Sequence, residues 1–140
     1  MRAGAKPLCG AKHDGPYYYP TVLTDVTVNM RVFREETFGP VVSVMAARDA
    51  QEAVRIANDT TYGLTAGIIT GDLQKGLDLA ERIESGMVHV NDASVNDEPH
   101  CPFGGMKGSG FGRHGGKALV DEFTEQRWIT VQRTPRVYPF

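Results

Sequence analysis

The clearest structural signal in this chain begins with Val41-Val42-Ser43-Val44-Met45-Ala46-Ala47, an apolar run typical of a strand buried on both faces. Asp49 follows as a helix N-cap, and Glu52, three residues later, completes the pattern of a capping box. The helix is expected to end by Gly63 and to pack on the sheet through one apolar face. That face consists of Ala50, Ala53, Val54 and Ala57.

A second strand, a second helix and a third strand follow in order. Residues 66–70 predict the strand, and Asp72 caps a helix that Gly86 closes. Residues 87–91 predict the third strand. Two strand–helix–strand crossovers in succession indicate a parallel sheet covered by helices, about half of a doubly wound α/β domain. The remaining strands must come from elsewhere. The apolar face of the second helix is formed by Leu73, Leu77, Ala80 and Ile83.

The flanking segments predict two further strands, a loop and a helix. Residues 17–24 fit a short strand that Gly15-Pro16 sets off. The glycine-rich stretch, residues 102–116, leads into a short helix near residues 117–123. Residues 127–132 alternate polar and apolar side chains, as in a strand with two unlike faces. This terminal strand has no obvious local partner.

Composition favours a globular domain of ordinary type. The 140 residues are 41% hydrophobic and 23% charged, but 16 glycines and 8 prolines reduce the apolar surface that a lone domain can bury. Positive and negative charges are interspersed in a net charge of -2, which argues against nucleic acid as a partner. No run of roughly 18 apolar residues suits a membrane span. No apolar stretch follows the basic residues at the start, so we expect a cytoplasmic protein.

The two cysteines do not indicate a metal centre. Cys9 and Cys101 lie outside any C-x-x-C pair, so neither a disulfide framework nor a zinc site is predicted, and both thiols are expected to be reduced. Cys9 with His13, and His100 with Cys101, could be read as ligand pairs. Because no further ligands can be named, we assign no metal.

The glycine-rich stretch contains a motif of low specificity. Gly110-Phe111-Gly112-Arg113-His114-Gly115 fits G-x-G-x-x-G, with which a backbone approaches a pyrophosphate at a helix N-terminus. A dinucleotide site also needs a strand directly before the glycines and an acidic residue roughly 20 residues later. A loop precedes these glycines instead. We therefore favour a tight loop with positive φ at several positions, and rank a free-standing dinucleotide-binding domain last.

A carboxylate and an aromatic side chain stand together in Glu35-Glu36-Thr37-Phe38-Gly39-Pro40, immediately before the first predicted strand. By position alone, a solvated charged turn is the better interpretation. Four motifs in order along the chain favour a functional role for this segment over a solvated turn. Together they strongly resemble the aldehyde dehydrogenase superfamily. They are Glu35-Glu36-Thr37-Phe38-Gly39-Pro40-Val41, Ala57-Asn58-Asp59-Thr60-Thr61-Tyr62-Gly63-Leu64-Thr65-Ala66, Ser85-Gly86-Met87-Val88-His89-Val90-Asn91 and Pro102-Phe103-Gly104-Gly105-Met106-Lys107-Gly108-Ser109-Gly110.

The resemblance extends from about Gly4 to Gln132 and matches only the C-terminal portion of a family subunit. It implies part of a doubly wound, parallel-sheet catalytic domain over residues 1–122, followed by an oligomerisation strand and tail over residues 123–140. It also implies homo-oligomers that assemble through this strand. The strand residues are Trp128, Ile129, Thr130, Val131 and Gln132.

The same resemblance implies the roles of individual residues. Glu36 would hold the ribose hydroxyls of the nicotinamide half of NAD or NADP, and Phe38 would pack near the nicotinamide ring. The loop over residues 93–103 would line the aldehyde tunnel. Asn91, which precedes this loop, is expected to hold backbone through its amide. The tunnel-lining candidates are Ala93, Ser94, Val95, Cys101 and Phe103.

A narrower resemblance concerns the substrate. Asp97-Glu98-Pro99-His100 and Phe123-Thr124-Glu125-Gln126-Arg127-Trp128-Ile129-Thr130 resemble dehydrogenases of aromatic aldehydes such as benzaldehyde, vanillin and salicylaldehyde. The alternative interpretation is that these residues are shared by several substrate classes.

The matched region contains none of the family's reacting groups. The nucleophilic cysteine, the asparagine of the oxyanion site, the water-activating glutamate and the rest of the dinucleotide site lie upstream in the family. We assign no catalytic residue, neither Cys9 nor Cys101, and predict that the chain alone lacks activity. The alternative hypothesis is a non-catalytic module that docks to full-length subunits through its terminal strand. The sequence leaves open which aldehyde is used, NAD or NADP, whether Met1 is a true start, and whether the chain folds stably alone.

Overall fold

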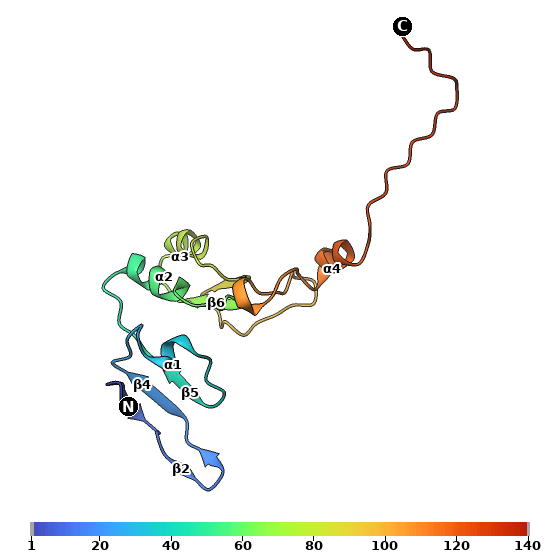
Figure 1. Cartoon of the computed structure of the whole chain (residues 1–140). Coiled ribbons are helices and arrows are strands. Elements are labelled where there is room, and N and C mark those ends of the chain that lie inside the picture. Colours follow the sequence, from blue (N-terminus) through green and yellow to red (C-terminus); the bar gives the residue numbers. More distant parts are fainter. Residues whose placement is uncertain (1, 140) are drawn as a thin grey trace.

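The computed structural model describes residues 2–139 and arranges them as two small sheet-containing parts followed by a long tail (Figure 1). The first sheet has the order β1-β4-β5, from β1 (Lys6–Cys9), β4 (Thr21–Thr24) and β5 (Val41–Ser43). Strands β2 (His13–Asp14) and β3 (Tyr17–Tyr18) form a hairpin, and β6 (Thr65–Ile68) pairs with β7 (Met87–Val90). The helices are α1 (Arg31–Arg34), α2 (Ala50–Asn58), α3 (Leu73–Ala80), η1 (Lys107–Ser109, a 3-10 helix) and α4 (Gly116–Glu122).

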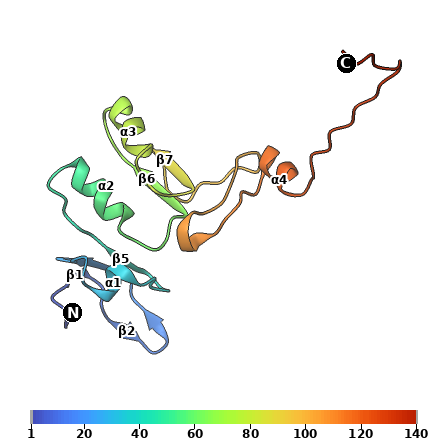
Figure 2. The ribbon, with the colours of Figure 1, turned by 45° about the horizontal axis from the view of Figure 1, so that its top comes forward.

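The predicted strand–helix–strand unit is present in β6, α3 and β7. The two strands are parallel, with Thr65 opposite Met87 and Ile68 opposite Val90. Asp72 caps α3 as predicted, since its Oδ1 accepts a hydrogen bond from Lys75 N at 3.1 Å. In both views α3 lies over this pair of strands (Figure 2). The parallel α/β character expected from the sequence is therefore confirmed.

The helix faces differ from the prediction. Helix α3 approaches the sheet through Gly76, which is buried, whereas Leu73 and Leu77 are 61% and 47% exposed. A β-carbon on Gly76 would lie 2.7 Å from Cγ1 of Val90, so the helix backbone comes too close to β7 for a larger residue. Helix α2 likewise buries Val54 but leaves Ala53 and Ala57 exposed. The helices end at Asn58 and Ala80, before Gly63 and Gly86.

The first predicted crossover does not join one continuous sheet. Strand β5 pairs in parallel with β4, with Thr21 opposite Val41, while β6 belongs to a separate sheet. Val42 and Val44 are 54% and 49% exposed, so the prediction of a strand buried on both faces was wrong for this chain. The reason is that no second layer of described residues covers this face of β5. The strand also ends at Ser43 rather than Ala47.

The strand predicted over residues 17–24 is divided into β3 and β4. Pro20 stands between them and has no N–H group to donate to a ladder. The chain is anchored again at Thr21, which is buried, and whose Oγ1 accepts from Ala11 N and donates to the carbonyl oxygen of Tyr19.

The apolar core of the described chain is small. Ala5, Val26 and Met30 form a buried cluster near α1, with Leu23, Val32, Phe33 and Met45 packed against it. Val54 is the remaining buried apolar residue among those described. Many large apolar side chains stay exposed, as expected for a chain that cannot bury a full core alone.

The glycine-rich stretch folds as a tight loop. Gly110, Gly112, Gly115 and Gly116 have positive φ, as the sequence predicted. An isolated bridge between Phe103 and His114 closes the loop, with both backbone hydrogen bonds at 2.7 Å, and α4 follows where the sequence placed a helix.

Residues 124–139 have no regular secondary structure and extend away from the rest of the chain (Figure 1). Trp128, Ile129 and Val131 are 90%, 72% and 78% exposed. The strand predicted over residues 127–132 is therefore not formed here, because no other described segment pairs with it.

Candidate functional site

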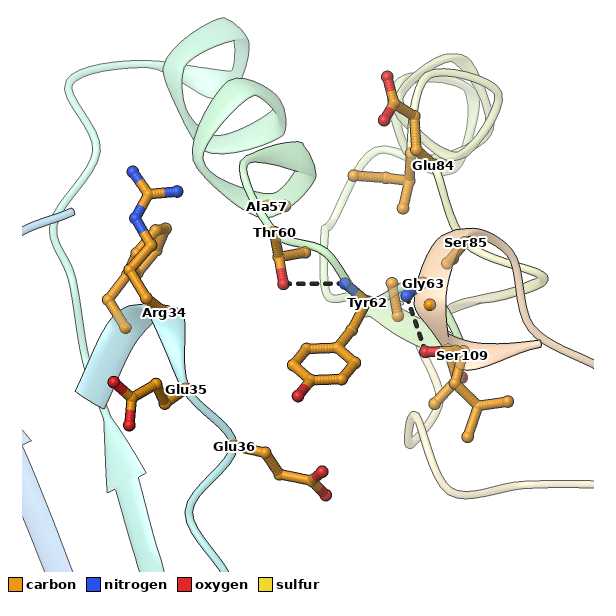
Figure 3. A pocket seen from close by; sticks show the side chains of 16 residues that line it. Arg34, Glu35, Glu36, Ala57, Thr60, Tyr62, Gly63, Glu84, Ser85 and Ser109 are labelled. Atoms are coloured by element: carbon orange, nitrogen blue, oxygen red, sulfur yellow. Dashed lines mark hydrogen bonds between the residues drawn. The ribbon is translucent and has the colours of Figure 1, made fainter. Parts of the chain in front are cut away.

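A cavity with a volume of ≈ 590 Å³ lies between α1, the end of α2 and the glycine-rich loop. One wall comes from the turn after α1, the floor from β6 and the segment before it, and the opposite wall from η1. In Figure 3, Glu36 and Ser109 enter from different elements, with Tyr62 between them. The lining residues include Glu35, Glu36, Tyr62, Gly63, Gly108 and Ser109.

The two adjacent glutamates have different surroundings. Both carboxylate oxygens of Glu35 accept hydrogen bonds from the Arg31 guanidinium, at 2.8 and 2.7 Å. These hydrogen bonds hold the pKa of Glu35 below its usual value. The carboxylate of Glu36 has no hydrogen bond or ion pair with any described residue, and it lines the cavity. Glu36 is therefore the carboxylate that is free to accept hydrogen bonds from a ligand.

The turn at the end of α2, residues 58–60, is tied to the wall that carries Glu36. The Arg34 guanidinium donates two hydrogen bonds to the Asp59 carboxylate in a bidentate arrangement, at 2.6 and 2.9 Å. Its Nη1 also donates to the carbonyl oxygen of Asp59 at 3.1 Å. The same guanidinium donates through Nε to the carbonyl oxygen of Val28 at 2.7 Å. The hydrogen bonds from Arg34 lower the pKa of Asp59.

The same turn is tied to the glycine-rich loop. The Lys107 ammonium donates to the carbonyl oxygens of Asn58 and Thr60, at 2.8 and 3.3 Å, and pairs with Glu84 at 2.7 Å. The backbone of Lys107 has φ 53°, in the left-handed region. Close by, Gly108 N donates to the carbonyl oxygen of Thr61 at 2.9 Å.

Asn58 extends the network to the segment after α3. Its Nδ2 donates to the carbonyl oxygen of Arg82 at 2.8 Å, and its Oδ1 accepts from Glu84 N at 2.9 Å. Sequence reasoning assigned no role to Arg34, Asn58, Asp59 or Lys107. Their only signal was that Asn58, Asp59 and Lys107 stand inside two of the four motifs.

The predicted tunnel-lining residues fall into two groups. Cys101 and Phe103 line a second cavity of ≈ 330 Å³, together with Asp97, Glu98 and residues of β7. Ser94 instead lies against β6, where its carbonyl oxygen accepts from Oγ1 of Thr65 at 2.8 Å. Val95 is 91% exposed, and Ala93 is also exposed. Neither these three residues nor Phe38, which is 93% exposed, lines a cavity with Glu36.

Asn91 holds backbone, as expected. Its Oδ1 accepts a hydrogen bond from Thr70 N at 2.8 Å, and the residue has a positive φ of 60°. The partner is the segment after β6 rather than the following loop. In the preceding strand β7, Nε2 of His89 is buried without a partner among the described atoms.

Both cysteine thiols are free and exposed. Within residues 2–139, no three His, Cys, Asp or Glu side chains gather as a metal site would need. None of the helices in that part of the chain has the length and apolar character that crossing a membrane requires.

The model of the family described as "Aldehyde dehydrogenase family" matches residues 1–129. The chain belongs to the aldehyde dehydrogenase family. Among curated aldehyde dehydrogenases, it is 48% identical to the benzaldehyde dehydrogenase [NAD(+)] of Pseudomonas putida, covering 100% of this chain and 29% of that protein. It is 43% identical to the vanillin dehydrogenase of Pseudomonas sp. (strain HR199 / DSM 7063), covering 99% of this chain and 29% of the relative.

Solved aldehyde dehydrogenases also match. A salicylaldehyde dehydrogenase from Pseudomonas putida G7, complexed with salicylaldehyde, superposes with a TM-score of 0.90 at 42% identity, over 99% of this chain and 29% of that one. A Mycobacterium tuberculosis aldehyde dehydrogenase complexed with NAD+ gives a TM-score of 0.86 at 34% identity, over 97% and 29%. The fold is thus part of an aldehyde dehydrogenase catalytic domain, and the resemblance to this family is confirmed.

Proposed function

We propose that this chain is the C-terminal part of an aldehyde dehydrogenase that oxidises an aromatic aldehyde to the carboxylic acid with NAD or NADP. The observation that carries the proposal is the similarity, over essentially the whole chain, to benzaldehyde, vanillin and salicylaldehyde dehydrogenases. The chain spans 29% of the length of these relatives. In this proposal residues 1–122 belong to the catalytic domain and residues 123–140 form the oligomerisation strand and tail of a cytoplasmic enzyme.

Glu36 is the cofactor-binding residue of this proposal. An unpaired carboxylate accepts two hydrogen bonds from vicinal hydroxyls, which is the chemistry that the nicotinamide ribose requires. The free carboxylate of Glu36 at the cavity wall fits that role. The Glu35 carboxylate does not, because both of its oxygens already accept hydrogen bonds from Arg31. When bound, the cofactor supplies the hydride acceptor. Phe38, exposed here, is placed against the nicotinamide, where a flat side chain excludes water.

The substrate loop supplies specificity in the same proposal. Cys101 and Phe103 line a cavity beside β7 in which Met87, Val88 and Pro102 add apolar surface that suits an aromatic ring. Ala93, Ser94 and Val95 are assigned to the tunnel further along the loop.

The chain alone is proposed to be inactive. Aldehyde oxidation in the family needs a thiolate that attacks the carbonyl carbon and a base that activates water. The Cys101 thiol is exposed and has no hydrogen bond to a described base that could activate it as that nucleophile.

A chimera tests the function. The chain replaces the segment with which it aligns in the Pseudomonas putida benzaldehyde dehydrogenase. NADH formation with benzaldehyde is followed by the absorbance of NADH at about 340 nm. We expect the chimera to oxidise benzaldehyde and the isolated 140-residue chain to show no aldehyde-dependent NADH. A folded chimera that oxidises no aromatic aldehyde would overturn the proposed function. Activity of the isolated chain would overturn the proposed inactivity.

A second function, docking to other subunits, is favoured by one observation. Trp128, Ile129 and Val131 are largely exposed in a segment without strand partners, and such backbone is a template for pairing with another sheet. Light scattering after size exclusion tests this on the whole chain and on a version deleted from Gln126 onward. If the whole chain is a compact monomer and the deletion changes nothing, the docking function fails.

A further inference from the structure

Two cations from different walls of the large cavity meet at one turn. Arg34 stands two residues before Glu36 and binds the carboxylate and carbonyl of Asp59. Lys107 stands in η1, on the opposite wall, and binds the carbonyls of Asn58 and Thr60. The residue pairs are separated by 25 positions for Arg34 and Asp59 and by 49 for Lys107 and Asn58, so these contacts depend on the fold and not on local sequence.

The electrostatics of this turn favour both contacts. Residues 58–60 comprise the last residue of α2 and the two residues after it, at the helix end where backbone carbonyls lack intrahelical partners and the helix dipole is negative. Arg34 and Asp59 are about half exposed, at 44% and 45%, but their two-pronged geometry fixes the guanidinium more firmly than a single surface contact does. The Lys107 side chain is 25% exposed and satisfies three acceptors.

We propose that Arg34, Asp59 and Lys107 are positioning residues for the nicotinamide cofactor. Through their contacts the turn at residues 58–60 is bound to both walls of the cavity, an arrangement that we call the clasp, and this fixes the position of Glu36. This inference rests on the proposed function, since it assumes that Glu36 receives the ribose hydroxyls. Glu36 has no described partner of its own, so its place is fixed by the backbone that Arg34 anchors.

Hydrogen–deuterium exchange on the 140-residue chain tests the clasp without any catalysis. Asp59→Ala is expected to speed exchange in the peptide that covers residues 35–40 by several-fold. The matched control is Asp121→Ala, which removes the ion pair between Lys117 and Asp121 in α4, away from this cavity. Equal exchange of residues 35–40 in Asp59→Ala and wild type would overturn the clasp, as would an equal increase in Asp121→Ala.

Steady-state kinetics of the chimera test the positioning role. Asp59→Ala is expected to raise KM for NAD+ about tenfold with kcat within about twofold, because uniform cofactor binding is lost and the reacting groups are untouched. Asp59→Asn keeps an acceptor for Arg34 and should give a smaller rise, whereas Asp121→Ala should give none. Equal effects of Asp59→Ala and Asp121→Ala, or a fall in kcat alone, would overturn the role. An inactive wild-type chimera would contradict the proposed function, while the exchange experiment would still decide the clasp.

Discussion

Gly86 lies against the carbonyl oxygen of Gly104, so closely that a β-carbon on Gly86 would overlap that oxygen. This approach joins the start of β7 to the glycine-rich loop, next to the backbone hydrogen bond from Gly86 N to the carbonyl oxygen of Gly63 at 2.9 Å. The glycine is thus required by contact between two backbones, and not as the end of a helix.

Gly86→Ala should destabilise the chain by about 1–3 kcal/mol, because the loop must move to admit the methyl group. Gly71 is the matched control, since a β-carbon there would meet nothing within 4 Å. Gly71→Ala should stay within about 0.5 kcal/mol of wild type in urea unfolding followed by circular dichroism. Equal midpoints for the two variants would contradict the close contact.

Helix α2 depends on its N-cap. Asp49 Oδ1 accepts from Glu52 N at 2.8 Å, and the Glu52 carboxylate accepts in return from the backbone of Arg48, one residue before the position of a standard capping box. Asp49→Ala should cost about 1 kcal/mol, and Asp49→Ser should restore most of it. Amide exchange within α2 is the measurement, and no difference between the two variants would argue against the cap.

Glu52 gives the chain a defined acid sensitivity. Hydrogen bonds from the side chain and backbone of Arg48 lower the pKa of Glu52 from 4.5 to about 2. Because the folded pKa is the lower one, the ionised carboxylate stabilises the fold above pH 4.5, and this contribution is lost as the pH falls toward about 2. Titration of the Glu52 carboxyl by NMR should give a midpoint near 2, moving up in Arg48→Ala. A wild-type midpoint near 4.5 would contradict the contact.

Substitutions of the neighbouring residues Glu36 and Glu35 are expected to have different effects on KM for NAD+. In the chimera, Glu36→Gln should raise KM for NAD+ about tenfold, because the charged acceptor for the ribose hydroxyls is lost. Glu35→Gln should leave KM within about twofold, since Glu35 is bound by Arg31. A larger effect at Glu35 would show that the wrong carboxylate has been assigned.

Local features of the fold could be predicted from the sequence. The caps at Asp49 and Asp72 and the positive φ values of the glycine-rich loop depend on residues a few positions apart. The parallel pair of β6 and β7 was predictable because the capped helix α3 stands between the two strands. The pairing of β5 with β4 could not be predicted, because only the four-residue helix α1 lies between these two strands and the sequence carries no signal of a crossover there. The inner face of α3 was misjudged because Gly76, with no side chain, carries no apolar signal.

The candidate site, like the fold, could be predicted from the sequence only in part. Glu36 was identified by resemblance to a motif, and its cofactor role stays a prediction; the structure adds that its carboxylate lines the cavity without a described partner. The pair of Arg34 and Asp59 was missed because each residue alone resembles an ordinary surface charge. Only the folded chain brings the two together across 25 positions.

The tail over residues 124–139 bears on how long the chain survives in a cell. Arg127, Arg133 and Arg136 all lie in this exposed segment without secondary structure, where proteases cut most readily. Cleavage after Arg127 would remove Trp128, Ile129 and Val131 together and leave α4 intact. Susceptibility to trypsin-like digestion therefore reports whether this segment has been covered by another polypeptide.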